Sequence, residues 1–384
     1  MSGPLAGLKI VEMAGIGPVP FAGMLLADLG ASIVRVDRLQ AADVGLPDRI
    51  PPRFDVMARG RRRIAVDLKD EPGRRVVQRL VHDADVLMEG FRPGVMERLG
   101  LGPEPCLANN PRLVYARMTG YGQSGPMRDA AGHDLNYISL TGALHAIGSA
   151  DGPPVPPLTL VGDFGGGAML LAVGILAALR VARETGKGQV VDAAMTEGAS
   201  YLMAPYYGLL AAGHWQDARG ANILDGAAPW YRTYATRDKR YVAVSAIERR
   251  FYEALVAGLG LDPATLPDQH DRTRWPELTR IFATAFKKRT RADWAAHFAE
   301  REACVTPVLS IGEAPHHPHL AQRGVFIAPD GVPQPAPHPR FSATPAAPGT
   351  PPVAAGADTR AVLADHGFSP AEIAALIATG TCGG

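Results

Sequence analysis

Short apolar runs separated by helical patterns fill the first third of the chain. Segments rich in Val, Ile, Leu and Met predict strands at 8–13, 31–37, 64–68, 85–90 and 113–118. Between them, residues 71–81 have the spacing of an amphipathic helix, and an apolar helix is expected to end near Gly30. Strands that alternate with helices in this way favour a parallel sheet, so we predict an α/β fold.

Two longer apolar stretches follow, and each begins directly after an acidic residue. Asp134 precedes the run 135–144, and Asp163 precedes a run that continues to about Thr185. An Asp before an apolar run is a helix N-cap signal, so a helix start is predicted at both positions. The longest apolar run, Ala168–Leu179, is too short to span a bilayer.

The pattern changes from Asp225 onward. Residues 230–236 and 240–247 have the character of paired strands, and helical segments follow them. This mixture predicts a smaller α+β domain. Prolines then recur through 331–352, which indicates an extended linker across a surface, and one or two short helices are expected at 359–378.

Composition narrows the class of protein. Of the 384 residues, 47% are hydrophobic and 20% are charged, as in a globular protein with a sizeable core. The formal net charge of +1 is too small to attract the chain as a whole to nucleic acid or to a membrane. Three cysteines without metal-ligand spacing indicate a reducing compartment, and no signal peptide is evident. We therefore expect a cytoplasmic protein with no nucleic-acid partner and no membrane span.

His133 and Asp163 are the candidate proton-transfer groups, because each stands at the start of a predicted helix. A helix start concentrates backbone N–H groups and positive dipole, which favour a developing negative charge. A base, a carboxyl group and an anion site together suit proton abstraction next to a carbonyl. On these residues alone, a simple helix cap and a structural histidine remain open alternatives.

The sequence contains parts of three other kinds of site, but each of them is incomplete. The glycine-rich turn 15–20 follows a predicted strand as in dinucleotide-binding folds, but Pro20 stands where the third glycine is needed. Residues 163–165, Asp-Phe-Gly, imitate the kinase metal-binding triplet, but no His-Arg-Asp loop precedes them. The histidines at 316, 317 and 319 lack a Cys or carboxylate to complete a metal set. We predict neither NAD nor a metal ion.

Two longer segments carry a specific resemblance. Residues 132–140 read Gly-His-Asp-Leu-Asn-Tyr-Ile-Ser-Leu, and residues 160–167 read Leu-Val-Gly-Asp-Phe-Gly-Gly-Gly. They resemble the two catalytic segments of the α-methylacyl-CoA racemases in the family III CoA-transferase superfamily. The similarity covers nearly the whole chain, from residues 8–12 (Leu-Lys-Ile-Val-Glu) to residues 304–309 (Cys-Val-Thr-Pro-Val-Leu).

The resemblance implies inversion at C2 of a 2-methylacyl-CoA thioester by 1,1-proton transfer through an enolate. No cofactor is expected, since CoA is part of the substrate. His133 and Asp163 would exchange the roles of acid and base. Glu248, after the predicted strand 240–247, would orient His133, and the backbone N–H of Asp134 would bind the enolate oxygen.

The resemblance also implies a set of residues that bind CoA, most of them near the ends of predicted strands. They are Arg38, Val66, Asp67, Leu68, Lys69, Gly90, Phe91, Arg92, Arg98, Gly132 and Tyr137. The basic run 59–63 (Arg-Gly-Arg-Arg-Arg) lies nearby, and guanidinium groups pair well with phosphate oxygens. A solvated surface is the alternative interpretation of this run.

An interlocked homodimer is the assembly that the resemblance implies. A large Rossmann-like α/β domain comes from both chain ends, a smaller α+β domain lies between them, and the active site combines domains of two chains. The expected parts are residues 1–193 (large domain, N-terminal part), 194–222 (linker helix), 223–314 (small domain), 315–352 (return linker) and 353–384 (large domain, C-terminal part). The expected partners are the acyl-CoA thioester and a second copy of the chain.

Two alternatives remain beside racemisation. A family III CoA-transferase would use Asp163 as a nucleophile that forms a mixed anhydride with the acyl group. That chemistry needs no histidine opposite the carboxylate, so the presence of His133 and Glu248 favours racemisation. A non-catalytic acyl-CoA-binding protein would have no use for the complete set of proton-transfer residues.

Overall fold

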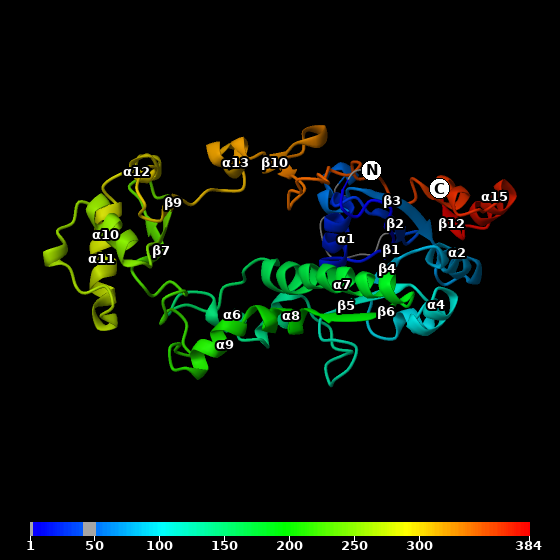
Figure 1. Ribbon diagram of the computed structural model, residues 1–384, viewed down its shortest axis with the longest axis horizontal. Helices are drawn as coiled ribbons and strands as arrows, with labels where there is room; N and C mark the ends of the chain where they lie inside the picture. The colour runs from blue at the N-terminus through cyan, green and yellow to red at the C-terminus, as the bar shows by residue number, and fades with distance from the viewer. Residues whose placement is uncertain (1–2, 41–50) are drawn as a thin grey trace. The chain divides into compact units, whose positions relative to one another are not determined.

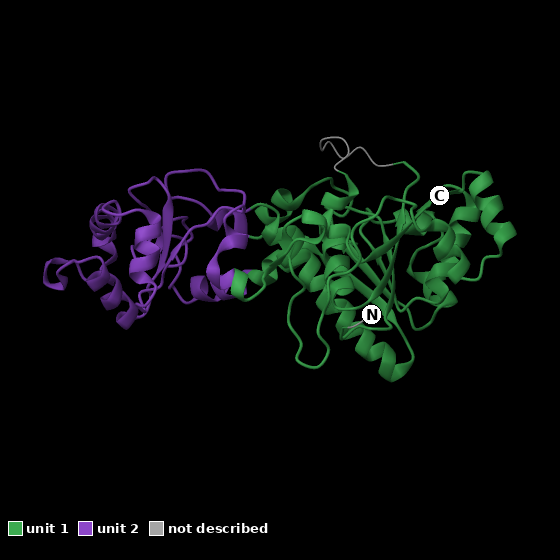
Figure 2. Cartoon of the chain, turned by 90° about the horizontal axis from the view of Figure 1, so that it is seen from above, with its two compact units in different colours: residues 1–141, 158–202, 321–384 green, residues 142–157, 203–320 purple. Residues whose placement is uncertain are grey.

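The computed structural model describes residues 3–40 and 51–384, and the chain divides into two compact units. Unit 1 comprises Met1–Thr141, Leu158–Leu202 and Ala321–Gly384, so both ends of the chain belong to it. Unit 2 comprises Gly142–Pro157 and Met203–Leu320. Figure 2 shows the two units in different colours. The chain therefore passes from unit 1 to unit 2 and back two times.

Unit 1 is built on one sheet, whose seven described strands lie in the order β12-β3-β2-β1-β4-β5-β6. They are β1 (Lys9–Met13), β2 (Ser32–Asp37), β3 (Arg61–Val66), β4 (Val86–Glu89), β5 (Val114–Thr119), β6 (Gln189–Ala194) and β12 (Cys382–Gly383). Strands β1 to β6 pair in parallel, and β12 runs antiparallel to β3. The order 3-2-1-4-5-6 is that of a doubly wound Rossmann-type sheet, in which the winding reverses between β1 and β4. The predicted α/β fold with a large parallel sheet is confirmed.

Helices cover both faces of this sheet, because successive side chains of a strand point to opposite faces. Ile10 of β1 belongs to the core under α1 (Pro18–Asp28) and α7 (Leu170–Thr185). Its neighbour Val11 belongs to the core on the other face. That second face is covered by α2 (Glu71–His82), α4 (Pro103–Asn109), α14 (Thr359–Asp365) and α15 (Pro370–Ala378), as can be followed in Figure 1.

Shorter elements complete unit 1. They are α3 (Val95–Arg98), α5 (Asp134–Ser139), α8 (Met195–Leu202), the antiparallel pair β10 (Phe326–Ile327) and β11 (Gln334–Pro335), and the 3-10 turns η1 (Pro52–Phe54), η2 (Val56–Ala58) and η7 (Pro329–Gly331). A π-helix, η3 (Leu160–Met169), continues directly into α7. The predicted β-strands are present, but β10, β11 and β12 were not predicted, because two-residue strands leave no pattern to detect.

The helical stretch of η3 and α7 is longer than the sequence pattern indicated. It spans Leu160–Thr185, 26 residues, and by length and composition alone it could cross a membrane. The prediction that this segment is too short was therefore wrong. In the structure Leu171 and Ile175 are buried in the core beneath α7, where a helix of a protein interior has the same composition as a membrane span.

Unit 2 combines an antiparallel sheet with helices. The sheet contains β7 (Tyr231–Ala235), β8 (Tyr241–Ser245) and β9 (Val305–Pro307). The helices are α6 (Ala143–Ala146), α9 (Ala204–Ala211), α10 (Arg249–Gly258), α11 (Trp275–Phe286) and α12 (Arg291–Phe298), with η4 (Pro263–Thr265), η5 (Arg272–Arg274), η6 (Ala314–His316) and, at the boundary with unit 1, α13 (Pro318–Gln322). Its core is rich in aromatic rings, and the buried indole N–H of Trp294 donates to the Phe286 carbonyl (2.7 Å).

Three arginines of the basic run 59–63, Arg59, Arg61 and Arg63, pair with carboxylates inside unit 1 and form neither a phosphate site nor a solvated surface. Arg62 differs, because its side chain is 38% exposed and pairs with the exposed Asp365 at 2.6 Å. The Arg59 guanidinium pairs with both carboxylate oxygens of Asp28, at 3.0 and 2.6 Å. Arg61 is fully buried and pairs with Glu12 at 2.9 Å, and Arg63 pairs with Asp37 at 2.7 Å. These carboxylates neutralise the arginines inside unit 1, so strand β3 begins at Arg61 and not at residue 64 as predicted.

Candidate active site

The C-terminal ends of β1, β4 and β5 meet where the winding of the sheet reverses, which is where open α/β sheets bind ligands. Gly17, after β1, allows the Asp163 side chain to approach the backbone closely, since a Cβ at Gly17 would lie 2.7 Å from a carboxylate oxygen of Asp163. Gly120, after β5, does the same for Tyr137, whose ring would lie 2.1 Å from such a Cβ. The segments α5 and η3 therefore lie against this edge of the sheet.

His133 precedes α5 with an extended backbone (φ −132°). Its backbone N–H donates to the Asn136 side chain (3.1 Å), and the Asn136 N–H donates to the His133 carbonyl (2.8 Å). These two bonds fix the helix start while the His133 side chain stays exposed. Asp134 is the first helical residue, so its backbone N–H has no partner within the helix.

Asp163 lies within the π-helix η3, not at a helix N-cap as predicted. Glycines allow this wide turn to pack against α8. A Cβ on Gly166 would lie 2.5 Å from the Ala199 nitrogen, and one on Gly198 would lie 1.8 Å from the Gly166 carbonyl oxygen. The N-cap prediction failed because the residues before Asp163 are already helical. π-helical turns are rare and occur frequently at functional sites.

The Asp134 carboxylate joins these two segments. Its Oδ2 accepts a hydrogen bond from the backbone N–H of Asp163 at 2.7 Å. Gly162 leaves the space for it, since a Cβ there would lie 2.5 Å from the same oxygen. The other oxygen, Oδ1, is buried and has no hydrogen-bond partner among the residues described. The resemblance implies a role only for the backbone N–H of Asp134, so this side-chain contact was not predicted.

The carboxyl group of Asp163 is tuned toward neutral pH. Burial raises its pKa from 3.8 to about 6, with a further rise from the charge of Asp134 and an opposing effect of His133. A carboxyl group with such a pKa both accepts and donates a proton readily near pH 7. The effect of His133 on this pKa shows that the two predicted proton-transfer groups lie within electrostatic reach of each other.

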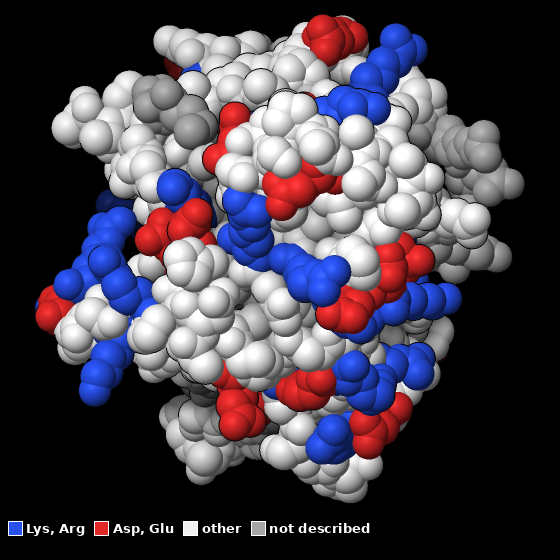
Figure 3. Space-filling model, turned by 90° about the vertical axis from the view of Figure 1, so that its right-hand side faces the viewer, with Lys and Arg blue, Asp and Glu red and all other residues white. Residues whose placement is uncertain are grey.

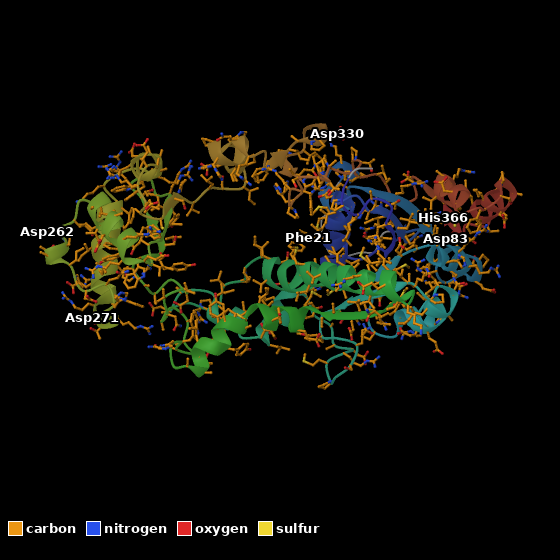
Figure 4. All side chains as sticks on the ribbon, viewed as in Figure 1. Phe21, Asp83, Asp262, Asp271, Asp330 and His366 are labelled. Carbon is orange, nitrogen blue, oxygen red and sulfur yellow. The ribbon has the colours of Figure 1, made fainter. Side chains whose placement is uncertain are left out.

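Helix α1 packs against the π-helix η3. Phe21, labelled in Figure 4, stacks on Phe164 with ring centroids 4.5 Å apart. Gly17 is the N-cap of α1 and has φ 67°, a conformation that side chains rarely adopt. The Asp163 carboxylate next to Gly17 thus occupies the helix start at which a Rossmann fold binds pyrophosphate. A negative group there is a second physical reason, beside Pro20, why this turn is unsuited to a dinucleotide.

Tyr137 connects the catalytic segments with the predicted CoA-binding turn. Its ring lies edge-on to that of Tyr121, with centroids 5.0 Å apart, and its hydroxyl donates to the Gly132 carbonyl. Burial, Tyr121 and the charge of Asp163 raise the pKa of Tyr137 to about 12, while Arg92 opposes the rise. Asp163 and Arg92 therefore both lie within electrostatic reach of the Tyr137 hydroxyl.

Several predicted CoA-binding residues come together at this edge. The Arg38 guanidinium, after β2, lies 6.0 Å from the ring centroid of Phe91, after β4. Val66 is only 1% exposed and is part of the hydrophobic core of unit 1. The exposed members of the set are Arg38, Lys69, Gly90, Arg92 and Arg98, and the partly buried ones are Asp67, Leu68, Phe91 and Gly132.

Glu248 belongs to unit 2, whereas His133, Asp134 and Asp163 belong to unit 1. It is an exposed residue that follows β8 and caps the start of α10. Its carbonyl accepts hydrogen bonds from the backbone N–H groups of Phe251 (3.0 Å) and Tyr252 (2.9 Å), one helical turn later. Its predicted contact with His133 stays a prediction.

Away from this site the charged surface is mixed. On the face at the right of Figure 1, Lys and Arg alternate with Asp and Glu (Figure 3). Exposed ion pairs such as Arg75 with Glu71 (2.7 Å) fit this pattern. Across residues 3–40 and 51–384, no group of three or more His, Cys, Asp and Glu side chains is arranged to hold a metal ion.

Comparison with known proteins places this geometry in a family. The family model of CoA-transferase family III matches residues 5–359, which is most of the chain. The chain belongs to CoA-transferase family III. Two similar family members are the alpha-methylacyl-CoA racemases of Mus musculus and Homo sapiens. The mouse protein is 46% identical (97% of this chain, 96% of the relative), and the human protein is 44% identical (96% and 95%).

More distant relatives show the breadth of family III. The acetyl-CoA:oxalate CoA-transferase of Acetobacter aceti is 31% identical over 87% of this chain and 88% of the relative. Among solved structures, a CaiB/BaiF family protein from Brucella suis aligns with a TM-score of 0.84 at 28% identity, over 95% of this chain and 100% of that one. The relatives of this chain therefore include proteins named as racemases and proteins named as CoA-transferases.

In this family III chain, the sequence did not predict the residues that leave space for, or pack against, the catalytic segments. Gly17 and Gly162 make room for the carboxylates of Asp163 and Asp134, and Phe21 supports the π-helix. The sequence does indicate Gly17, because the glycine-rich turn 15–20 lies between a predicted strand and a helix that begins with proline.

Proposed function

We propose that this protein racemises 2-methylacyl-CoA thioesters at C2. One observation carries the proposal: Asp163, with a pKa of about 6, lies within electrostatic reach of His133 at the ligand-binding edge of the sheet. The names and high identities of the mouse and human racemases support it.

The reaction proceeds by proton transfer alone. The thioester carbonyl acidifies the Cα–H bond. One group takes this proton, the bond's electron pair passes into an enolate, and the second group returns a proton to the opposite face. For one hand of the substrate Asp163 accepts and His133 donates, and for the other hand the roles reverse. CoA is part of the substrate, and no further cofactor takes part.

The start of α5 stabilises the enolate. The backbone N–H of Asp134 has no helical partner, so it donates to the enolate oxygen. Losing one such donor typically costs about 3–4 kcal/mol of transition-state stabilisation. Glu248 orients His133 and favours its protonated form, while Arg38, Arg92 and Arg98 bind the phosphates of CoA.

The working assembly in this proposal is an interlocked homodimer, with a large domain from both chain ends and a smaller α+β domain between them. Support comes from unit 1, which contains both chain ends, and from the division of His133 and Glu248 between the units. Light scattering at assay concentrations tests it. A monomer that retains full activity would contradict the shared site.

Incubation of each enantiomer of a 2-methylacyl-CoA in D₂O tests the reaction. We expect deuterium to enter Cα as optical activity is lost. His133→Ala should stop exchange first from one hand and Asp163→Asn from the other, each with a loss of about 10²–10⁴-fold. His82→Ala, a change at an exposed histidine of α2, is the matched control and should leave exchange intact.

A transferase gives a different result in the same experiment. Cα hydrogen would stay in place, and hydroxylamine would trap an acyl adduct on Asp163 when a CoA donor is present. CoA transfer between acids without deuterium uptake would therefore refute the racemase proposal.

A further inference from the structure

A buried arginine lies beneath the predicted CoA-binding turn. Arg117 of β5 and Glu89 of β4 are register partners in the sheet, and they are 6% and 1% exposed. The Arg117 Nε–H donates to Glu89 Oε1 at 2.9 Å. A charge buried this deeply requires a partner, and Glu89 supplies one.

Glu89 also holds the first part of the turn. Its second oxygen, Oε2, accepts the backbone N–H of Phe91 at 2.8 Å. The carboxylate therefore fixes the direction in which the chain leaves β4. Arg92, with an exposed side chain, is the next residue.

The free end of the Arg117 guanidinium holds the last part of the turn. Nη1 and Nη2 donate to the two oxygens of Glu97 in α3, at 2.8 and 3.2 Å. Such a two-point contact fixes orientation as well as distance. Glu97 directly precedes Arg98, so one side chain ties both ends of the segment that carries Arg92 and Arg98.

The charges show that Arg117 acts through its partners rather than on a ligand. Two carboxylates share its single positive charge, and its side chain is 7% exposed. Although burial opposes the effect, the hydrogen bonds from Arg117 hold the pKa of Glu97 below its usual value. A neutralised, buried guanidinium has little attraction left for a phosphate group.

We propose that Arg117 is a positioning residue for CoA, because with Glu89 and Glu97 it holds residues 90–98 so that Arg92 and Arg98 face the CoA phosphates. This inference rests on the proposed binding of CoA at this turn. It predicts an effect confined to the nucleotide part of the substrate. The pantetheine part and the acyl group would be held elsewhere.

Glu97→Gln is the main test, because the Glu97 side chain is 45% exposed and its loss leaves Arg117 paired with Glu89. We expect CoA to bind about tenfold more weakly by calorimetry, equivalent to about 1.4 kcal/mol. KM for the CoA thioester should rise by a similar factor with little change in kcat. The kcat/KM for the matching pantetheine thioester, which lacks the nucleotide phosphates, should not change. Arg117→Lys, which keeps the charge but not the two-point contact, should behave in the same way.

Two comparisons interpret the result. Arg92→Ala should show the same selective loss, whereas Glu104→Gln, a change at an exposed residue of α4, should bind CoA like the unaltered protein. Equal losses for both thioesters would reduce Arg117 and Glu97 to a structural role and overturn the inference. Unchanged CoA binding in Glu97→Gln would overturn it too. Failure of the unaltered protein to bind CoA at all would instead refute the proposed function together with the inference.

Discussion

Replacing Asp134 with Asn separates the charge of this side chain from its hydrogen bond. The amide retains an oxygen that accepts the Asp163 N–H, so the link of 2.7 Å between α5 and η3 is preserved. The negative charge is removed, and that charge is one of the two causes that raise the pKa of Asp163. The substitution therefore changes the proton affinity of the catalytic carboxyl with little change in its position.

The magnitude follows from the shift of Asp163. Its rise from 3.8 to about 6 is about two pKa units, or about 3 kcal/mol, with burial the larger cause and Asp134 the smaller. Because burial remains in the variant, we expect the pKa to fall by about one unit, to about 5. Both directions of racemisation require that the His133–Asp163 pair holds one proton. The acidic limb of the pH–rate profile should therefore shift in the same way for both enantiomers.

The assay is the pH dependence of kcat/KM for each enantiomer, which reports groups of the free enzyme. The acidic limb of Asp134→Asn should lie about one pH unit below that of the unaltered protein. Asp134→Ala is the contrast, because it also leaves a buried N–H unpaired and should slow the reaction about 10–100-fold at every pH. An acidic limb that stays in place, or moves to higher pH, in a normally folded Asp134→Asn protein would refute this reasoning.

Two further predictions concern stability. Folding raises the pKa of Asp163, so its favourable contribution is complete below pH 3.8 and is lost as pH rises through about 6. Asp163→Asn should therefore increase the free energy of unfolding at pH 7.5 by about 2 kcal/mol, allowing for partial exposure, and by little at pH 4; urea titrations at both values check this, and an equal effect would contradict it. Arg59→Met leaves Asp28 buried without its partner, so unfolding should cost about 3–5 kcal/mol less, while KM for the CoA thioester stays the same. A raised KM with unchanged stability would return Arg59 to the phosphate site.

The sequence predicted those features that leave a local pattern. Strand positions from β1 to β5 followed from apolar runs, and the parallel sheet followed from their alternation with helices. The Rossmann-like character of the large domain was implied by the resemblance. His133 and Asp163 are candidates because each is a titratable group before an apolar run, and the resemblance favours proton transfer over a simple helix cap. In each case the information lay within a few consecutive residues.

Features that depend on distant residues were missed or misinterpreted. Asp163 has the local signature of an N-cap, but the glycine contacts between η3 and α8 make the segment a π-helix. Arg61 looked like a surface cation because its partner, Glu12, lies on another strand. The contact of Asp134 with the Asp163 N–H required the same knowledge of two separate segments.

The closing of the sheet by the last residues of the chain has a consequence for synthesis. The outer edge of β3 is paired with Cys382–Gly383, and the Arg63 N–H donates to Asp358. Both partners are synthesised about 300 residues after β3, so β3 keeps an open edge until they have left the ribosome. An unpaired strand edge is a template for pairing with other chains. Nascent chains that stall before Asp358 therefore expose the edge of β3 that residues 382–383 would cover.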